Sequence, residues 1–103
     1  MIRHLVFLRF ADDMTRQDRD DLMDELAALR DEIDGIDDFC ARPNVSPETA
    51  FTRGMSEMFW FDFRDARARD AYLANETHKA IGARLLAGLD GGADGIFVCD
   101  VEI

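Results

Sequence analysis

The opening stretch Met1-Ile-Arg-His-Leu-Val-Phe-Leu-Arg-Phe10 decides the fold that this chain of 103 residues is expected to adopt. Successive side chains of a β-strand point to opposite faces, which divides the stretch into two surfaces. One surface carries Ile2, His4, Val6, Leu8 and Phe10, and the other carries Arg3, Leu5, Phe7 and Arg9. Both surfaces are apolar in the middle, as is typical of a central strand that is covered on both sides. His4 is the one ionisable group among the apolar residues of its surface.

The sequence predicts an amphipathic helix directly after this strand. Thr15 is a suitable N-cap, and a stripe of apolar residues with spacings of four, three and four follows it: Leu22, Leu26, Leu29 and Ile33. The acidic residues fall mostly on the other side, and Gly35 is expected to end the helix. Residues 36–45 then predict a short strand at an edge of the sheet, because Pro43 has no backbone N–H to donate.

Two further strands are expected in the second half of the chain. Residues 55–63 alternate between two apolar faces, which predicts a central strand beside the first one. The more apolar of these faces again contains a single ionisable group, Glu57. Residues 96–103 also alternate, and they predict the strand that completes the sheet.

The segment between these two strands is expected to be helical in two parts. Asp65 is a suitable N-cap for the first part, and residues 75–77 interrupt the helical pattern. Thr77 is expected to cap the second part, over residues 78–89. The order β-α-β-β-α-β predicts an α+β, ferredoxin-like fold, in which a four-stranded antiparallel sheet has both helices on one face. The length predicts a single domain over residues 1–103.

The face of the sheet that the helices leave bare is expected to be an interface. Leu5, Phe7, Met58 and Trp60 fall on this face. An exposed apolar patch of this kind marks an interaction site, and packing two such sheets face to face would bury it in a two-fold symmetric dimer. We therefore predict a homodimer through these four residues.

The charge of the chain narrows the choice of partners. The net charge is −10, and the segment from Ala11 to Asp38 holds twelve acidic residues against three arginines. Such a surface repels other polyanions, so neither nucleic acid nor an anionic membrane is expected to be a partner. The acidic segment is interpreted as a solvated helix face that maintains solubility.

Several other classes of site and location lack support in the sequence. Cys40 and Cys99 fit no metal or redox spacing, and they are expected to be reduced thiols. No His-x-x-x-His spacing indicates a metal site, and no cofactor motif is present. The first strand begins at Met1, with no targeting segment or membrane-spanning run before it, so a cytoplasmic location is expected.

The sequence resembles the stress-responsive α/β-barrel family, known as Dabb domains. The matching segments occur in the same order over essentially the whole chain: Arg3-His-Leu-Val-Phe-Leu-Arg-Phe10, Asn44-Val-Ser-Pro-Glu48, Phe61-Asp-Phe63, Arg69-Asp-Ala-Tyr-Leu-Ala-Asn-Glu-Thr-His78 and Asp100. The resemblance implies a dimeric α/β barrel, in agreement with the dimer argued above. The family includes the plant olivetolic acid cyclase, which closes a ring in a linear polyketide by aldol condensation.

The resemblance also implies a pocket between the sheet and the helices. His4, Tyr72 and His78 fall on the pocket positions of that cyclase, and Glu57 falls where the cyclase has a third histidine. This departure, and the Asn-Glu-Thr-His sequence before the last histidine, distinguish the chain from the cyclase. We take His4, Glu57, Tyr72 and His78 as the candidate catalytic residues.

The residues themselves support two interpretations of this set. Glu57 and His4 are expected on neighbouring strands, where a carboxylate would orient an imidazole for acid/base chemistry, while Tyr72 would donate a hydrogen bond and His78 would move a proton. Alternatively, Glu57 and His4 satisfy each other inside the core, Tyr72 is a core aromatic residue, and His78 is an exposed residue of a first helical turn.

Three functions therefore follow as hypotheses. The first is cofactor-independent acid/base chemistry on a carbonyl compound of the polyketide type, in a small-molecule pocket reached by all four side chains. The second is a non-catalytic stress or accessory protein whose core is filled by Phe59, Phe61 and Phe63. The third is a cofactor-free monooxygenase in which Trp60 takes part, although its expected place on the interface face favours packing.

Overall fold

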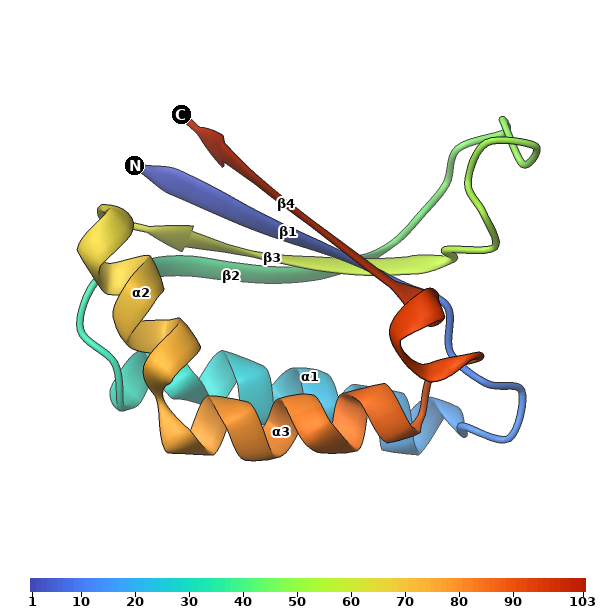
Figure 1. Cartoon of the computed structure of the whole chain (residues 1–103), viewed down its shortest axis with the longest axis horizontal. Coiled ribbons are helices and arrows are strands. Elements are labelled where there is room, and N and C mark those ends of the chain that lie inside the picture. The colour runs from blue at the N-terminus through green and yellow to red at the C-terminus, as the bar shows by residue number, and fades with distance from the viewer.

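The computed structural model describes residues 1–103 and contains one sheet with its helices on one side (Figure 1). The strands are β1 (Ile2–Leu8), β2 (Ile36–Pro43), β3 (Glu57–Phe63) and β4 (Ile96–Glu102). The helices are α1 (Arg16–Ala27), α2 (Ala66–Ala74) and α3 (Glu76–Ala87), with short 3₁₀ turns at η1 (Ala28–Asp31) and η2 (Gly92–Gly95).

The sheet has the predicted ferredoxin-like arrangement. Its strand order is β2-β3-β1-β4, and all three pairings are antiparallel. The two strands predicted to be central, β1 and β3, are central, and β2 lies at an edge, where Pro43 is tolerated. Because β1 lies between β3 and β4, each of its residues has a partner on both sides.

The helices begin where side-chain caps are available. Thr15 caps α1 by accepting a hydrogen bond from the backbone N–H of Asp18, and Asp65 caps α2, as predicted. The cap of α3 differs from the prediction: Asn75 accepts from the backbone N–H of His78 at 2.9 Å, and Thr77 lies inside the helix. Asn75 is extended, with ψ of 131°, so it separates α2 from α3 with a sharp bend.

The core lies between the helices and the face of the sheet that carries His4. Its largest completely buried side chains are Tyr72, Phe61, Phe63, Leu8, Leu26 and Leu29. The stripe predicted for the first helical region is buried as expected, and it packs with aromatic residues of β3. Burial of this apolar surface is the main source of stability for a domain of this size.

The opposite face of the sheet is not covered by any helix (Figure 1). Leu5, Phe7, Met58 and Trp60 lie on this open face and are only partly buried, and Phe97 on β4 is 59% exposed beside them. The free thiols of Cys40 and Cys99 lie in the same row of the open face. None of the helices has both the length and the apolar character needed to cross a membrane.

Candidate functional site

Three of the four predicted site residues form one cluster, and the fourth does not join it. The ring centroid of Tyr72 lies 5.6 Å from that of His4 and 3.8 Å from that of His78. β1 contributes His4, the end of α2 contributes Tyr72, and the first turn of α3 contributes His78. The bend at Asn75 is what brings Tyr72 and His78 against each other, because it ends one helix and starts the next.

Glu57 lies at the other end of β3, and the prediction that it pairs with His4 is wrong. The register places Glu57 opposite Leu8, whereas His4 is opposite Phe61. Glu57 instead accepts hydrogen bonds from two arginines of α1, Arg16 at 2.7 Å and Arg19 at 2.8 Å. Glu57 and His4 do share a face of the sheet, as predicted. They are nevertheless far apart, because the register places them at different positions along the strands.

The carboxylate partner of His4 is Asp100 on β4. Nδ1 of His4 is 2.6 Å from Oδ1 of Asp100, and Arg69 on α2 donates from Nη1 to the other carboxylate oxygen at 2.7 Å. Burial acts to raise the pKa of Asp100, but the hydrogen bonds from Arg69 and His4 outweigh it and hold the pKa below its ordinary value. Asp100 is therefore ionised and can only accept, so Nδ1 of His4 carries the proton.

Burial fixes the protonation states of Tyr72 and His78, so that one can donate a proton in a hydrogen bond and the other can accept one. Burial raises the pKa of Tyr72 far above its ordinary value, so its hydroxyl stays protonated. Burial lowers the pKa of His78, and the nearby His4 lowers it further, so His78 is neutral near pH 7. Its Nδ1 is buried and has no partner with hydrogen-bond geometry in the chain, although the nearby backbone of Tyr72 acts to raise the pKa and partly opposes the other two effects. An unsatisfied buried nitrogen is uncommon, and a bound ligand is one way to satisfy it.

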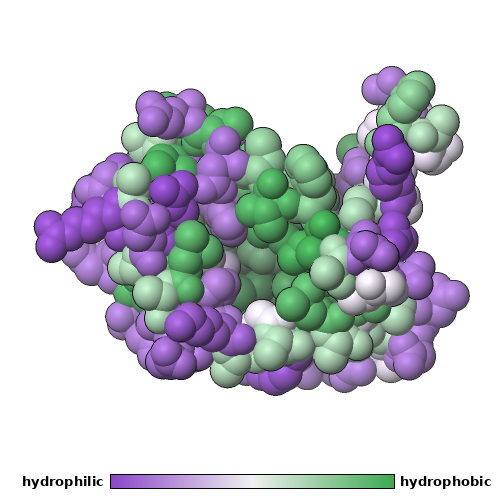
Figure 2. Space-filling view, viewed as in Figure 1, coloured by the Kyte–Doolittle hydropathy of each residue, from purple (hydrophilic) through white to green (hydrophobic).

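The helices leave an edge of the sheet uncovered near this region, between β4 and α3. Figure 2 shows hydrophobic side chains gathered around a hollow in the surface between these two elements. Val98 lies on the helix-facing side of β4, opposite the buried Val6, yet it is 50% exposed because the helices do not cover this edge. On α3, Gly82 follows His78 by one helical turn, and a Cβ atom placed on it would meet nothing within 4 Å.

The principal cavities of the chain lie elsewhere. None of them is lined by His4, Tyr72 or His78. Glu57 lines a separate cavity of about 540 Å³ together with Arg16. The single pocket reached by all four predicted residues is therefore not present, and the cluster is instead a packed group beside an uncovered edge of the sheet.

Two residues that support the cluster through hydrogen bonds, Asp100 and Arg69, were not predicted as site residues. Asp100 belongs to the alternating positions of β4 that face the helices, which was visible in the sequence. Its pairing with His4 depends on which strand lies beside β1 and in which register, and neither is encoded by local patterns. Arg69 lies three residues before Tyr72 on α2, so the two side chains share a helix face.

Together, the sheet order and the polar cluster define a ferredoxin-like α+β domain with ionisable groups enclosed between sheet and helices. The chain belongs to the family described as the stress responsive A/B barrel domain, or Dabb, whose model matches residues 2–103. A comparison with the curated proteins finds no match.

Solved structures share this fold over nearly the whole chain. A dimeric ferredoxin-like protein of unknown function from Jannaschia sp. CCS1 is 32% identical, with 99% of this chain and 98% of that chain covered and a TM-score of 0.88. A protein from Arabidopsis thaliana is 22% identical, with coverage of 100% and 95% and a TM-score of 0.88. The hydroxynitrile lyase from Passiflora edulis is 13% identical, with coverage of 99% and 92% and a TM-score of 0.83. The last two likenesses establish the shared fold.

Proposed function

We propose that the cluster of His4, Tyr72 and His78 binds a small carbonyl compound and moves protons on it without a cofactor. The observation that carries this proposal is the contact between a protonated tyrosine and a neutral histidine whose buried Nδ1 has no partner. Groups whose protonation states are fixed differently by their surroundings are what acid/base chemistry requires. The Passiflora edulis protein supports the proposal in one respect, since its name describes a lyase on the same fold.

In this proposal each group has a separate task. The hydroxyl of Tyr72 donates a hydrogen bond to the carbonyl oxygen of the bound compound, which stabilises the negative charge that develops there. His78, being neutral, accepts a proton from the carbon beside the carbonyl. Asp100 and Arg69 act through His4, since they fix its Nδ1–H and leave Nε2 free to accept or return a proton. A linear compound with several carbonyl groups would then close on itself, as in a polyketide cyclase.

We also propose that the functional unit is a homodimer formed through the open face, by Leu5, Phe7, Met58 and Trp60. Similar solved proteins are dimeric, including the one from Jannaschia sp. CCS1. The open face is the uncovered apolar surface of the sheet, and such a surface favours a second copy. In this arrangement Trp60 contributes to packing and lies on the opposite side of β3 from the cluster.

The test is the conversion of a linear 3,5,7-triketo thioester, whose C2 can attack the C7 carbonyl to close a six-membered ring, followed by liquid chromatography and mass spectrometry. Replacing His78 by Ala should abolish cyclisation, and Tyr72→Phe should slow it by about a hundredfold, because each removes a group that acts in the transition state. The matched control is Glu76→Gln, which changes an exposed residue two positions before His78 and should leave the rate unchanged. Circular dichroism confirms that each variant is folded. Equal rates for the wild type and His78→Ala would refute the assignment.

A second function, that of a non-catalytic accessory protein, is favoured by one observation. Phe59, Phe61 and Phe63 fill the core beside the cluster, and no principal cavity opens onto it. This alternative predicts that carbonyl compounds leave the NMR signals of the His78 imidazole unchanged. The first proposal predicts that they shift these signals, and that Tyr72→Phe weakens the shift.

A further inference from the structure

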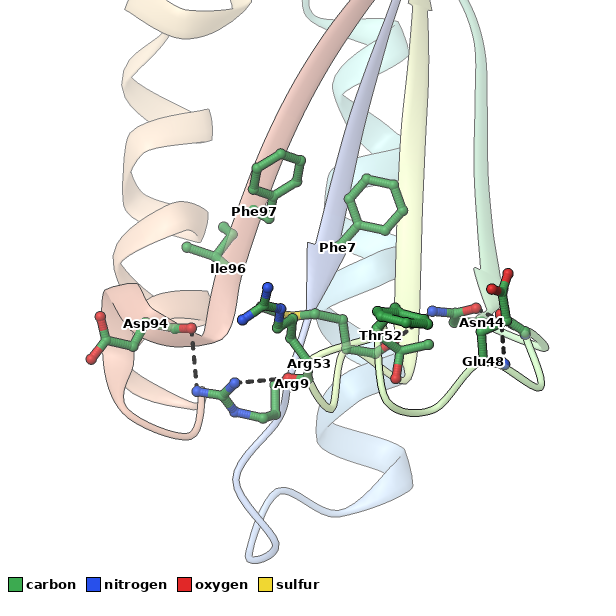
Figure 3. Close-up of a pocket in the computed structure, with 12 residues that line it drawn as sticks. Phe7, Arg9, Asn44, Glu48, Thr52, Arg53, Asp94, Ile96 and Phe97 are labelled. Atoms are coloured by element: carbon green, nitrogen blue, oxygen red, sulfur yellow. Dashed lines mark hydrogen bonds between the residues drawn. The ribbon is translucent and has the colours of Figure 1, made fainter.

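The largest cavity in the chain lies far from the cluster, at the end of the open face where the loop of residues 44–56 rises from the sheet. Its volume is about 870 Å³, within the range of small-molecule sites. Its apolar walls come from Phe7 and Phe97 on the open face and from Phe51, Met55 and Ile96 around them (Figure 3).

Hydrogen bonds within the chain already hold the polar residues of this cavity in place. Arg9 joins its two walls: it donates to the backbone carbonyl of Arg53 at 2.9 Å, and to those of Asp90 and Asp94 at 3.1 and 3.2 Å. On the other side, the amide of Asn44 donates to the carbonyl of Met55 at 2.8 Å. The loop is therefore held against the end of the sheet by bonds that span the cavity. These bonds engage both terminal nitrogens of Arg9, and its Nε lies 3.2 Å from the Asp90 carboxylate.

Arg53 stands out among the residues that line this cavity. Its φ is 56°, the only positive value at a residue other than glycine in the chain. Residues held in this left-handed region are strained, and they concentrate at binding sites. In Figure 3 the side chain of Arg53 extends from the loop across the end of β1 toward Ile96. Unlike Arg9, it makes no hydrogen bond or ion pair within the chain.

No acidic side chain of the cavity pairs with Arg53, so its guanidinium is available to bind an anion. Two carboxylates also belong to the lining, Glu48 and Asp94, and both are exposed. Figure 3 shows both side chains pointing outward, away from Phe7 and Phe97, while the Arg53 side chain points inward. Four of the eleven arginines form no ion pair (Arg30, Arg42, Arg53 and Arg67), and Arg53 is the one of them that lines this cavity together with aromatic side chains. A guanidinium matches carboxylate and sulfonate oxygens in geometry and in charge.

We propose that this cavity binds an amphipathic organic monoanion, with its acidic group on Arg53 and its apolar body against Phe7, Phe51 and Phe97. The site is separate from the proposed acid/base cluster and does not depend on it. Phe7 belongs both to this cavity and to the proposed dimer contact, so the bound molecule would lie at the edge of that contact, where the second copy would shield its apolar body.

Isothermal titration calorimetry with 2-naphthoate tests this proposal on the full chain. We expect one naphthoate per chain, and an increase of about tenfold or more in Kd for Arg53→Gln, because a charge-assisted hydrogen bond is lost. Arg53→Lys, which keeps the charge, should recover part of the affinity. The neutral analogue 2-naphthalenemethanol should bind the wild type and Arg53→Gln equally, since it has no charge for Arg53 to recognise.

The matched control is Arg67→Gln, which removes the other guanidinium that makes neither a hydrogen bond nor an ion pair and which does not line this cavity. It should bind naphthoate like the wild type, and so should His78→Ala. An unchanged Kd for Arg53→Gln would overturn the proposal, as would an equal loss in Arg67→Gln, which would indicate non-specific attraction. If Arg53→Gln instead dissociates the dimer without changing the Kd for naphthoate, the cavity belongs to the contact with the second copy and the proposal is wrong.

Discussion

At the level of single residues, the carboxylate of Asp100 determines what His4 can do. It accepts from Nδ1 of His4 and from Arg69 at the same time, so its two oxygens tie a strand of the sheet to a helix. Removing it would leave a buried imidazole N–H without a partner, and that is more costly than losing an exposed ion pair.

Replacing Asp100 by Asn should lower the free energy of unfolding at pH 7 by about 2 kcal/mol, because a charged hydrogen-bonding partner of a buried group is lost. The pKa of Asp100 is lower in the folded state, so its contribution is complete above the unfolded value of 3.8 and is lost as the pH falls through the folded value. Urea titrations between pH 7 and pH 3 should show the two proteins converging in acid. Asp70→Asn, at a well-exposed partner of Arg69, is the control and should change little. A constant difference at all pH values would contradict the assignment.

His78 should titrate below its ordinary pKa of 6.5, since burial and His4 both disfavour its charged form. Stability linked to His78 is complete above 6.5 and is lost as the pH falls toward the folded pKa, because the unfolded chain binds the proton first. The chemical shift of its Cε1 proton, followed by NMR from pH 8 to pH 4, gives the midpoint directly. His78→Gln assigns the resonance, and a midpoint above 6.5 would show that the imidazole is not desolvated.

At the level of the secondary structure elements, the alternation of apolar residues was sufficient to predict the strands and the faces they present. His4 was placed correctly on the helix-facing side of β1, and Tyr72 and His78 near the break between two helices. The partner of His4 was not predictable in the same way, because Glu57 and Asp100 share its face of the sheet and only the register separates them. The cavity lined by Arg53 could not be predicted from the sequence either, since it depends on a left-handed backbone conformation in a loop.

The bend between α2 and α3 depends on the cap at Asn75. Replacing Asn75 by Ala should lower the free energy of unfolding by about 1 kcal/mol, because the backbone N–H of His78 would lose its acceptor at the start of α3. The same change should loosen the contact between Tyr72 and His78. Thermal unfolding measures the first effect, and ring-current shifts of His78 measure the second. Thr77→Ala is the control, because the Thr77 hydroxyl bonds to the exposed Glu32 and does not cap the helix. If Thr77→Ala lowered the stability as much as Asn75→Ala, Thr77 and not Asn75 would be the N-cap.

Gly82 in α3 should show opposite effects on stability and on access to the cluster. Gly82→Ala should stabilise the chain by about 0.5–1 kcal/mol, because alanine favours a helix interior and its Cβ meets no other atom within 4 Å. The same methyl group would narrow the uncovered edge one turn from His78 and slow the turnover of a carbonyl compound. Denaturant midpoints and rates measured on one preparation test both expectations. Increased stability with an unchanged rate would show that compounds do not enter past Gly82.

At the level of the whole molecule, the open face should control assembly. Trp60→Arg places a charge in the middle of the proposed interface and should convert a dimer into a monomer of 11.7 kDa. Sedimentation equilibrium distinguishes the two masses. Leu73→Asp, which changes a hydrophobic side chain on α2 that is 45% exposed, is the control and should remain dimeric. A wild type that sediments as a monomer would refute the proposed interface.

The distance along the chain between His4 and Asp100 has a consequence for biosynthesis. The two residues are 96 positions apart and lie on strands that are neighbours in the sheet. A contact of this range is slow to form, since most of the chain must be organised before it closes. On the ribosome, β1 emerges first but receives its carboxylate only after β4 has been synthesised. A nascent chain that lacks β4 can therefore build α1 and part of the sheet, but it contains an unpaired imidazole in place of the cluster.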